Sequence, residues 1–215
     1  MTHCTDAELL MYEPDLALDA SLASQTILRS RAMLLRDQLT LIHAADTNQL
    51  QPARVLILPG QIAAVTGLCK SDHGGACYAV VGVSDSPEGC RVIHVRRGPS
   101  SPGFDVPIEV ELHVRTFWAQ RRVISELISR ARSSCASGRQ PLADTRELRR
   151  PTMLGTLHLI YSSLAATSDE VTDHTIRVEM YQRLYRRSLR SIGISSAVLG
   201  AVLGTVCGEL CESNQ

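Results

Sequence analysis

Aromatic side chains are scarce in this sequence of 215 residues, which contains two phenylalanines, one tryptophan and five tyrosines. Because the hydrophobic fraction is an ordinary 44%, aliphatic side chains must fill the interior of a globular fold. An excess of charge is also absent, since 22 basic residues balance 22 acidic residues. General nucleic-acid-binding proteins usually carry a basic excess, so the composition argues against that class.

The sequence also lacks a secretory signal and a membrane-spanning run. Acidic residues and Pro14 lie where a signal needs a basic start and an apolar stretch. The apolar tail from Ile192 to Cys207 is interrupted by glycines and is shorter than the about 20 apolar residues of a membrane helix. We therefore expect no membrane partner and a cytoplasmic protein, or a virion protein if the gene is phage-derived. The tail, residues 193–215, should dock on the body or on a neighbouring subunit.

Cysteine spacing gives no disulfide framework. The seven cysteines are an odd number, and without an export signal they are most simply reduced thiols. We expect no structural disulfide.

Charge is unevenly distributed along the chain. The segment from Arg115 to Arg190 carries fourteen arginines against seven acidic residues. Five acidic residues precede the first basic residue, Arg29: Asp6, Glu8, Glu13, Asp15 and Asp19. The two parts could attract each other within one chain or between neighbouring copies in a head-to-tail ring, although solvated helix faces without a partner would have the same pattern.

Residues 1–38 are expected to form the N-terminal helices. Thr5-Asp6-Ala7-Glu8 fits a capping box, in which the Glu8 carboxylate reaches back to the start of a helix that should end near Pro14. Asp15 can cap a second helix, over about Leu16–Leu35, whose apolar positions are loosely periodic.

Residues 39–116 show short apolar runs separated by turn residues, which predicts β-strands. The predicted strands are Leu39–His43, Arg54–Leu58, Gln61–Leu68, Cys77–Val83, Arg91–Arg96 and Pro107–Arg115. Pro59-Gly60 should form a tight turn, and Gly98–Gly103 is rich in breakers and should be an exposed, mobile loop. No helical crossover separates the runs, so we expect about five to six strands in a small antiparallel meander or barrel.

Residues 117–192 return to a helical period. A first helix should bury Phe117, Ile124, Leu127, Ile128 and Ala131. A polar linker should follow over residues 133–150, and then two helices from Thr152 to Ile192, the second starting at the capping-box pattern Thr167–Glu170. The first of these two should bury Met153, Leu157, Ile160, Tyr161 and Leu164. The expected fold class is therefore α+β: N-terminal helices, a small antiparallel β region, and a C-terminal bundle of about three helices.

The last helix carries two faces of different chemistry. Arg183, Arg186, Arg187 and Arg190 lie at i, i+3, i+4 and i+7 on one face. The residues at helical spacing on the core-facing side are Val178, Tyr181, Leu184, Tyr185, Ser188 and Ile192. Arginine suits phosphates, but the balanced charge and the position of both tyrosines on the apolar face make nucleic acid an unlikely partner. The favoured partner is acidic protein surface, such as the Asp6–Asp19 region of a neighbouring copy.

One cluster has residue types that bind metals: Cys69, His73, Cys77, Cys90 and His94. Its spacings, C-x3-H-x3-C and C-x3-H, are not a familiar pair of zinc-binding arms. Buried cysteines and a turn histidine are the ordinary interpretation, so no metal ligand is assigned. A small intracellular metal-binding or regulatory module that uses Cys69, His73, Cys77 and His94 is the alternative hypothesis.

No motif for catalysis is present. The cysteines and histidines fit neither a nucleophile elbow nor a cysteine-protease signature, and Gly74-Gly75 lacks the lysine and the strand-to-helix context of a phosphate loop. We expect a protein that is not an enzyme, with no catalytic residues and no cofactor.

Several stretches resemble the small head-to-tail connector (neck or head-completion) proteins of tailed bacteriophages and their prophage-like relatives in bacteria. These stretches are Thr5–Asp15, Arg54–Gly67, Gly155–Tyr161 and Tyr181–Arg190, which together cover about a third of the chain. The resemblance implies a structural virion-assembly protein that forms a homo-oligomeric ring. In such a ring helices pack between subunits, and a strand-rich portion or a loop reaches the next ring.

Overall fold

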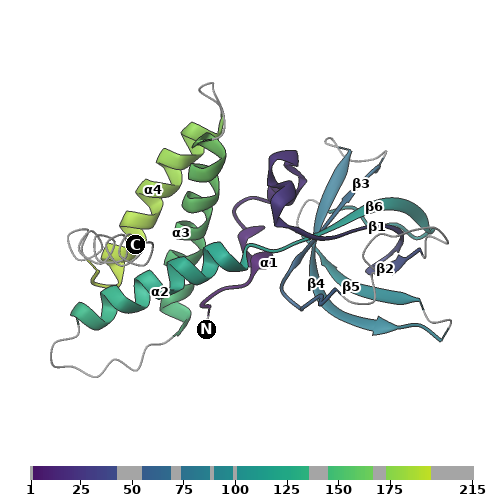
Figure 1. The fold of residues 1–215 in the computed structure, drawn as a ribbon, viewed down its shortest axis with the longest axis horizontal. Helices are drawn as coiled ribbons and strands as arrows, with labels where there is room; N and C mark the ends of the chain where they lie inside the picture. The colour runs from purple at the N-terminus through teal and green to yellow at the C-terminus, as the bar shows by residue number, and fades with distance from the viewer. Residues whose placement is uncertain are drawn as a thin grey trace, which may run out of the picture. The chain divides into compact units, whose positions relative to one another are not determined.

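The chain consists of two compact units in the computed structural model (Figure 1). One unit is Thr5–Phe117, and the other combines Met1–Cys4 with Trp118–Gln215. The structure describes residues 2–42, 55–68, 74–87, 90–98, 101–135, 145–166 and 173–194. The predicted α+β class is confirmed, with strands in the first unit and three long helices in the second.

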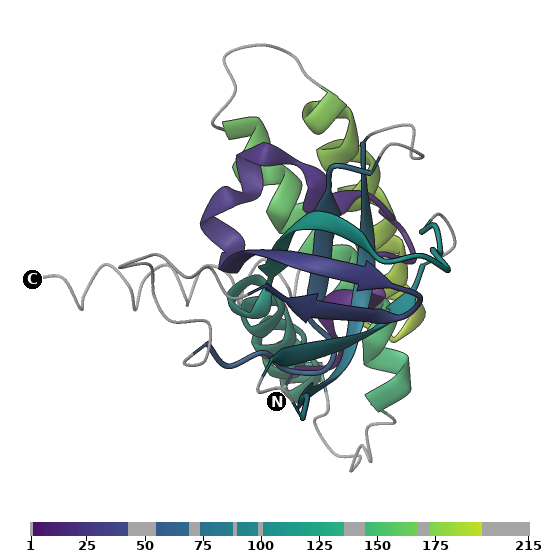
Figure 2. The same ribbon diagram turned by 90° about the vertical axis from the view of Figure 1, so that its right-hand side faces the viewer.

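Six antiparallel strands close into a barrel in the order β1-β2-β5-β4-β3-β6 (Figure 2). Their bounds are Thr26–Leu35 (β1), Gln38–Leu41 (β2), Ile62–Thr66 (β3), Gly75–Asp85 (β4), Arg91–Arg97 (β5) and Ile108–Arg115 (β6). Strand β6 pairs with both β1 and β3, which closes the ring of strands. Each of the six strands therefore pairs with a neighbouring strand on both sides.

The interior of the barrel is filled with side chains. On β6, Val110, Leu112 and Val114 are buried, whereas Glu109 is exposed and Glu111 is half-buried, as the alternating sequence predicts. Tyr78 of β4 is the largest buried side chain of this core, and its hydroxyl donates to the Pro102 carbonyl at 2.8 Å. The barrel interior therefore holds a packed core of side chains.

The prediction of a helix over Leu16–Leu35 is wrong for most of its length. Leu16–Leu18 and Ala20–Gln25 form short 3-10 helices, η1 and η2, and Thr26–Leu35 is strand β1. From Leu28 onward burial follows a period of two, because Leu28, Ala32 and Leu34 are buried and Arg29 and Arg31 are exposed. The two arginines pair with Glu111 and Glu109 on β6, which lies far along the chain and was not visible to a local pattern.

The prediction of a strand over Arg54–Leu58 is also wrong for its described residues, 55–58. Leu56 and Leu58 are exposed there, and no strand pairs with them. The turn at Pro59-Gly60 is confirmed, since the Gln61 N–H donates to the Leu58 carbonyl and Gly60 has a φ of 88°. The other five predicted strands match β2 to β6 to within a few residues.

The capping box at the start of the chain is confirmed. The Glu8 carboxylate accepts a 2.6 Å hydrogen bond from the Thr5 N–H, at the start of the short helix α1, Asp6–Leu9. The segment that follows α1 packs, through η1, against the outer face of β3 and β4. It therefore covers part of the barrel wall.

Three long helices form the other unit: α2 (Trp118–Cys135), α3 (Thr145–Ala166) and α4 (Asp173–Ser191). The predicted apolar faces of α2 and α3 are buried. The expected linker over residues 133–150 is wrong at both ends, because α2 continues to Cys135 and α3 already begins at Thr145, while 136–144 lie outside the described residues. The burial of Leu148 accounts for the earlier start of α3. The sequence did not reveal it, because Leu148 is surrounded by exposed arginines that are typical of a linker.

Helices α3 and α4 lie side by side as a hairpin (Figure 1), and α2 packs on α3. Gly155 of α3 lies where the three helices meet. A β-carbon built there would lie 2.8 Å from Ile124 Cγ2 and 2.9 Å from Tyr185 Cε2. The absent side chain lets α2 and α4 both approach α3 closely. The capping-box pattern Thr167–Glu170 and the tail from residue 195 lie outside the described residues.

Candidate functional site

Helix α4 has a buried side and an exposed side, as its sequence predicts. Tyr181, Tyr185, Ser188 and Leu189 are buried. The exposed side is named here the α4 outer face, and it comprises Ile176, Glu179, Met180, Arg183, Arg186, Arg187 and Arg190. These residues recur every three or four positions, so they form one continuous strip along the helix.

The four predicted arginines lie on the α4 outer face, and all are exposed. In the described part of the chain no carboxylate forms an ion pair with any of them; Arg183 Nε makes only a long 3.4 Å contact to the Glu179 carbonyl. Arginines elsewhere do have such partners, for example Arg97 with Asp37 and Arg122 with Glu126, each at 2.8 Å. The α4 outer face is thus a cationic surface not neutralised by the described residues of its own chain.

The tyrosines of α4 belong to the core of the helical unit. Tyr181 stacks on Tyr161 of α3 with ring centroids 5.6 Å apart and an interplanar angle of 6°. Arg177 lies over the Tyr161 ring and donates to its hydroxyl at 2.7 Å. Burial raises the pKa of Tyr185. Neither Tyr181 nor Tyr185 is exposed for stacking on a nucleic-acid base, in agreement with the sequence interpretation.

The five acidic residues of the predicted N-terminal surface lie in different surroundings. Asp6 is fully buried, with its carboxylate accepting hydrogen bonds from the Thr116 hydroxyl at 2.7 Å and the Phe117 N–H at 2.9 Å. Glu8 is occupied in the capping box, and the Asp19 charge acts on the guanidinium of Arg115, a buried residue. We therefore remove Asp6, Glu8 and Asp19 from the candidate surface.

Glu13 and Asp15 are kept as candidates for their position, because they lie in the turn after α1 next to an exposed apolar side chain. Asp15 is exposed and Glu13 is half-buried. The neighbouring Met11 has an exposed fraction of 75%, the highest among the large apolar side chains of the described residues. Sequence reasoning missed Met11, because nothing in the local pattern distinguishes an exposed apolar residue from a buried one there.

Ile176 and Met180 were not identified from the sequence either. Their exposed fractions are 64% and 37%, and they precede Arg183 and Arg187 on the α4 outer face. Their helical spacing could have identified them. Ile176 and Met180 lie in line with the arginines of α4 and not on the side of the helix that carries Tyr181 and Tyr185.

The structure does not bring Cys77 and His94 together. His94 is paired with Gly82, five residues beyond Cys77 on β4, which at about 3.3 Å per residue places them about 16 Å apart along the strands. The His94 Nε2 is 2.7 Å from the Ser84 hydroxyl. Cys69 and His73 lie outside the described residues, and within those residues no three potential ligands converge.

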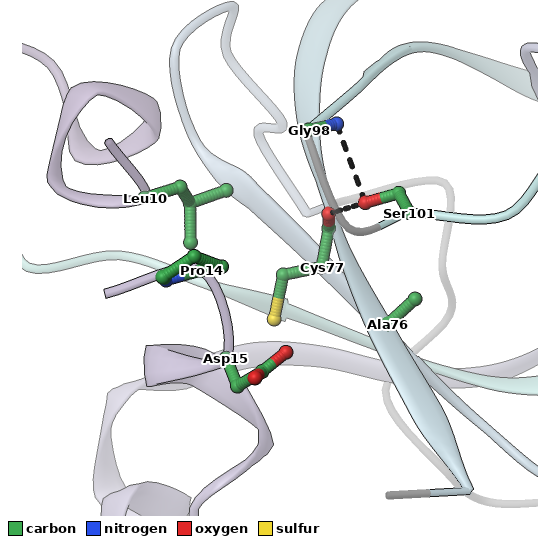
Figure 3. Close-up of a pocket in the computed structure, with 7 residues that line it drawn as sticks. All are labelled: Leu10, Pro14, Asp15, Ala76, Cys77, Gly98 and Ser101. Carbon is green, nitrogen blue, oxygen red and sulfur yellow. Dashed lines mark hydrogen bonds between the residues drawn. The ribbon is translucent and has the colours of Figure 1, made fainter. Parts of the chain in front are cut away.

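Cys77 faces outward from the barrel and is covered by the segment after α1. Figure 3 shows its sulfur pointing toward the stretch that carries Pro14 and Asp15. Burial raises the pKa of Cys77 to about 12. The adjacent pocket, lined also by Leu10 and Ser101, has a volume of about 10 Å³, room for about one water molecule. Such a thiol is a poor nucleophile, and the pocket is too small for an organic substrate.

The predicted loop Gly98–Gly103 contributes to the same region. Its described residue Ser101 donates from its hydroxyl to the Cys77 carbonyl at 2.6 Å and accepts from the Gly98 N–H at 3.3 Å (Figure 3). These bonds tie the end of the loop to β4. Pro99 and Ser100 lie outside the described residues.

A larger open depression, of about 690 Å³, lies beside the β1–β2 turn. Its charged side chains are already paired, Arg36 with Asp105 at 3.7 Å and Asp37 with Arg97 at 2.8 Å. The depression therefore offers no excess charge of either sign to a ligand. The α4 outer face is the stronger candidate site.

Within the described ranges, no helix combines the length and the apolar character that a bilayer crossing requires. Comparison of the chain with protein-family models, with curated proteins and with solved structures gives no match. The proposed function therefore draws on the site and on the sequence resemblance.

Proposed function

We propose that this chain is a non-enzymatic assembly protein that forms a homo-oligomer through the α4 outer face. The observation that carries the proposal is the row of four exposed arginines, which no carboxylate of the described residues neutralises. A surface of this kind attracts an acidic partner and orients it through arginine's planar donor groups. Together with the sequence resemblance, it supports a ring-forming subunit similar to the phage head-tail connectors, acting in the cytoplasm or in a virion.

A protein partner is favoured over nucleic acid by the composition of the same face. Ile176 and Met180 continue the arginine row, and exposed apolar side chains gain nothing from a phosphate backbone. The chain as a whole has no net charge, which removes the long-range attraction to nucleic acid. A protein surface with apolar and acidic parts suits both halves of the face.

A binding role is also favoured over catalysis by what the barrel unit offers. Cys77, whose thiol lies beside a small pocket, is covered and hard to ionise. In the larger depression, the charged side chains already pair with one another. The metal-binding alternative has no support from the separation of Cys77 and His94. These observations favour the assembly function.

Measurement of native mass tests this function. Sedimentation velocity and native mass spectrometry of the full chain at low ionic strength should show an oligomer that dissociates as salt is added, because screening weakens contacts between charges. Replacing Arg187 and Arg190 by Gln should weaken the oligomer, and replacing all four arginines should abolish it. The matched control replaces Arg96 and Arg150, two exposed arginines outside this face, and should leave the oligomer intact.

Two results would contradict the function. One is a wild-type chain that stays monomeric at every attainable concentration and at low salt. The other is tight binding of single-stranded DNA that is lost in the Arg187/Arg190 variant, which would assign the face to nucleic acid.

A further inference from the structure

The α4 outer face changes character along its length. At about 1.5 Å per residue, the apolar pair Ile176 and Met180 spans about 6 Å, and Arg183 to Arg190 spans about 10 Å further along the same strip. A complementary surface must therefore present an apolar side chain next to carboxylates. This order limits which surface can be the partner.

Two copies of the α4 outer face are poor partners for each other. Each face carries four arginines and one glutamate, Glu179, so each has a net charge of +3. A symmetric pairing brings two such faces together, and Glu179 can compensate only one arginine of the neighbouring copy. The contact must therefore be between two different surfaces.

The turn after α1 provides a surface with the required order. Met11 is the most exposed large apolar side chain of the described residues, and the carboxylates of Glu13 and Asp15 follow within four residues. The sequence here contains no basic residue before Arg29. We name this surface, Met11, Glu13 and Asp15, the N-terminal acidic turn.

We propose that the N-terminal acidic turn of one copy docks on the α4 outer face of the next copy. Met11 packs against Ile176 and Met180, and the Glu13 and Asp15 carboxylates accept hydrogen bonds from Arg183 and Arg187. The inference rests on the proposed homo-oligomeric function and names the partner surface for it. Such a contact is heterologous, so it propagates head to tail and closes into a ring if the rotation between neighbours allows closure.

Charge reversal on each surface tests the pairing in the full-length chain. The first variant carries Arg183→Glu and Arg187→Glu, and the second carries Glu13→Arg and Asp15→Arg. Each alone presents two surfaces of like charge, so its association should be at least about tenfold weaker than that of the wild type. An equimolar mixture of the two variants should reassemble, because each reversed surface then meets a reversed partner.

Further variants test the apolar half and the fold. Met11→Ser and Met180→Ser should each weaken association, whereas Val123→Ser, at a similarly exposed apolar position on α2, should not. If the Glu13→Arg, Asp15→Arg variant has an altered circular dichroism spectrum, a variant with Glu13→Gln and Asp15→Asn is used in its place. This neutralised variant should associate more weakly than the wild type when measured by itself.

The outcomes separate the two proposals. A wild-type chain that never associates overturns the proposed function and the docking with it. A wild-type chain that associates, together with folded reversal variants whose mixture stays monomeric, overturns the docking alone. The docking alone is also overturned if the Met11→Ser variant and the Glu13→Gln, Asp15→Asn variant both associate as strongly as the wild type.

Discussion

The buried carboxylate of Asp6 accepts a hydrogen bond from the Phe117 N–H at 2.9 Å, joining two residues 111 positions apart in the sequence. Its second oxygen accepts from the Thr116 hydroxyl at 2.7 Å. Asp6 thereby fixes the start of α1 to the chain that leaves strand β6, and both of its partners lie in the barrel unit. An acidic residue that looked like part of an interaction surface is instead a structural anchor.

Replacing Asp6 by Ala should destabilise the barrel unit by about 2–3 kcal/mol. The change removes two hydrogen bonds to a carboxylate and leaves the buried Phe117 N–H without an acceptor. Urea denaturation followed by circular dichroism measures the loss. Asp105→Ala, at a carboxylate that is 96% exposed, is the matched control and should shift the midpoint little. Equal effects of the two substitutions would show that the Asp6 hydrogen bonds add no stability.

Gly155→Ala should destabilise the helical unit although alanine is the better helix former. The helix propensity of alanine favours the variant by about 1 kcal/mol, but its β-carbon would lie within 3 Å of both Ile124 and Tyr185. Overpacking of this kind typically costs about 1–3 kcal/mol, so a net loss of up to about 2 kcal/mol is expected.

Thermal unfolding of Gly155→Ala, of Ile124→Ala and of the double variant measures this effect. The added methyl group should be tolerated better once Ile124 is truncated, which gives a favourable coupling between the two sites. Ser163→Ala, at an exposed position of α3, controls for propensity. A variant more stable than the wild type would mean that the helices can move apart without loss.

Local patterns in the sequence predicted the elements whose contacts are local. The Thr5–Glu8 capping box needs only four residues, and the alternation from Ile108 to Arg115 places one side of β6 in the core whatever its neighbours are. The arginine row of α4 follows in the same way from helical spacing. These features were confirmed because neither the fold around them nor a distant partner changes them.

Features that depend on remote partners could not be predicted. Strand β1 has two exposed arginines whose partners, Glu109 and Glu111, lie on β6, and without them the segment resembled a loose helix. Asp6 looked like surface charge because its partners, Thr116 and Phe117, come at the end of the barrel unit. Of the candidate site, the charges were predictable, but the exposure of Met11 and Ile176 was not.

The barrel unit should lose stability as the pH rises above about 9. Burial raises the pKa of Cys77 from 9.0 to about 12, and it raises the pKa of Tyr78 from 10.0 to about 12. An acid whose pKa is higher in the folded state stays protonated there while the unfolded chain ionises. The unfolded state therefore loses protons first, and stability falls through the window from pH 9 to pH 12.

Urea midpoints measured between pH 7 and pH 11 give the slope of stability with pH both below this window and inside it. Cys77→Ala should reduce the alkaline slope, since the group whose ionisation opposes folding is gone, even if the small cavity lowers stability at pH 7. Cys90→Ala, at a half-exposed thiol on the same unit, is the matched control for removing a cysteine. An alkaline slope that is identical in the wild type and in Cys77→Ala would mean that this thiol ionises as readily in the folded chain as in the unfolded one.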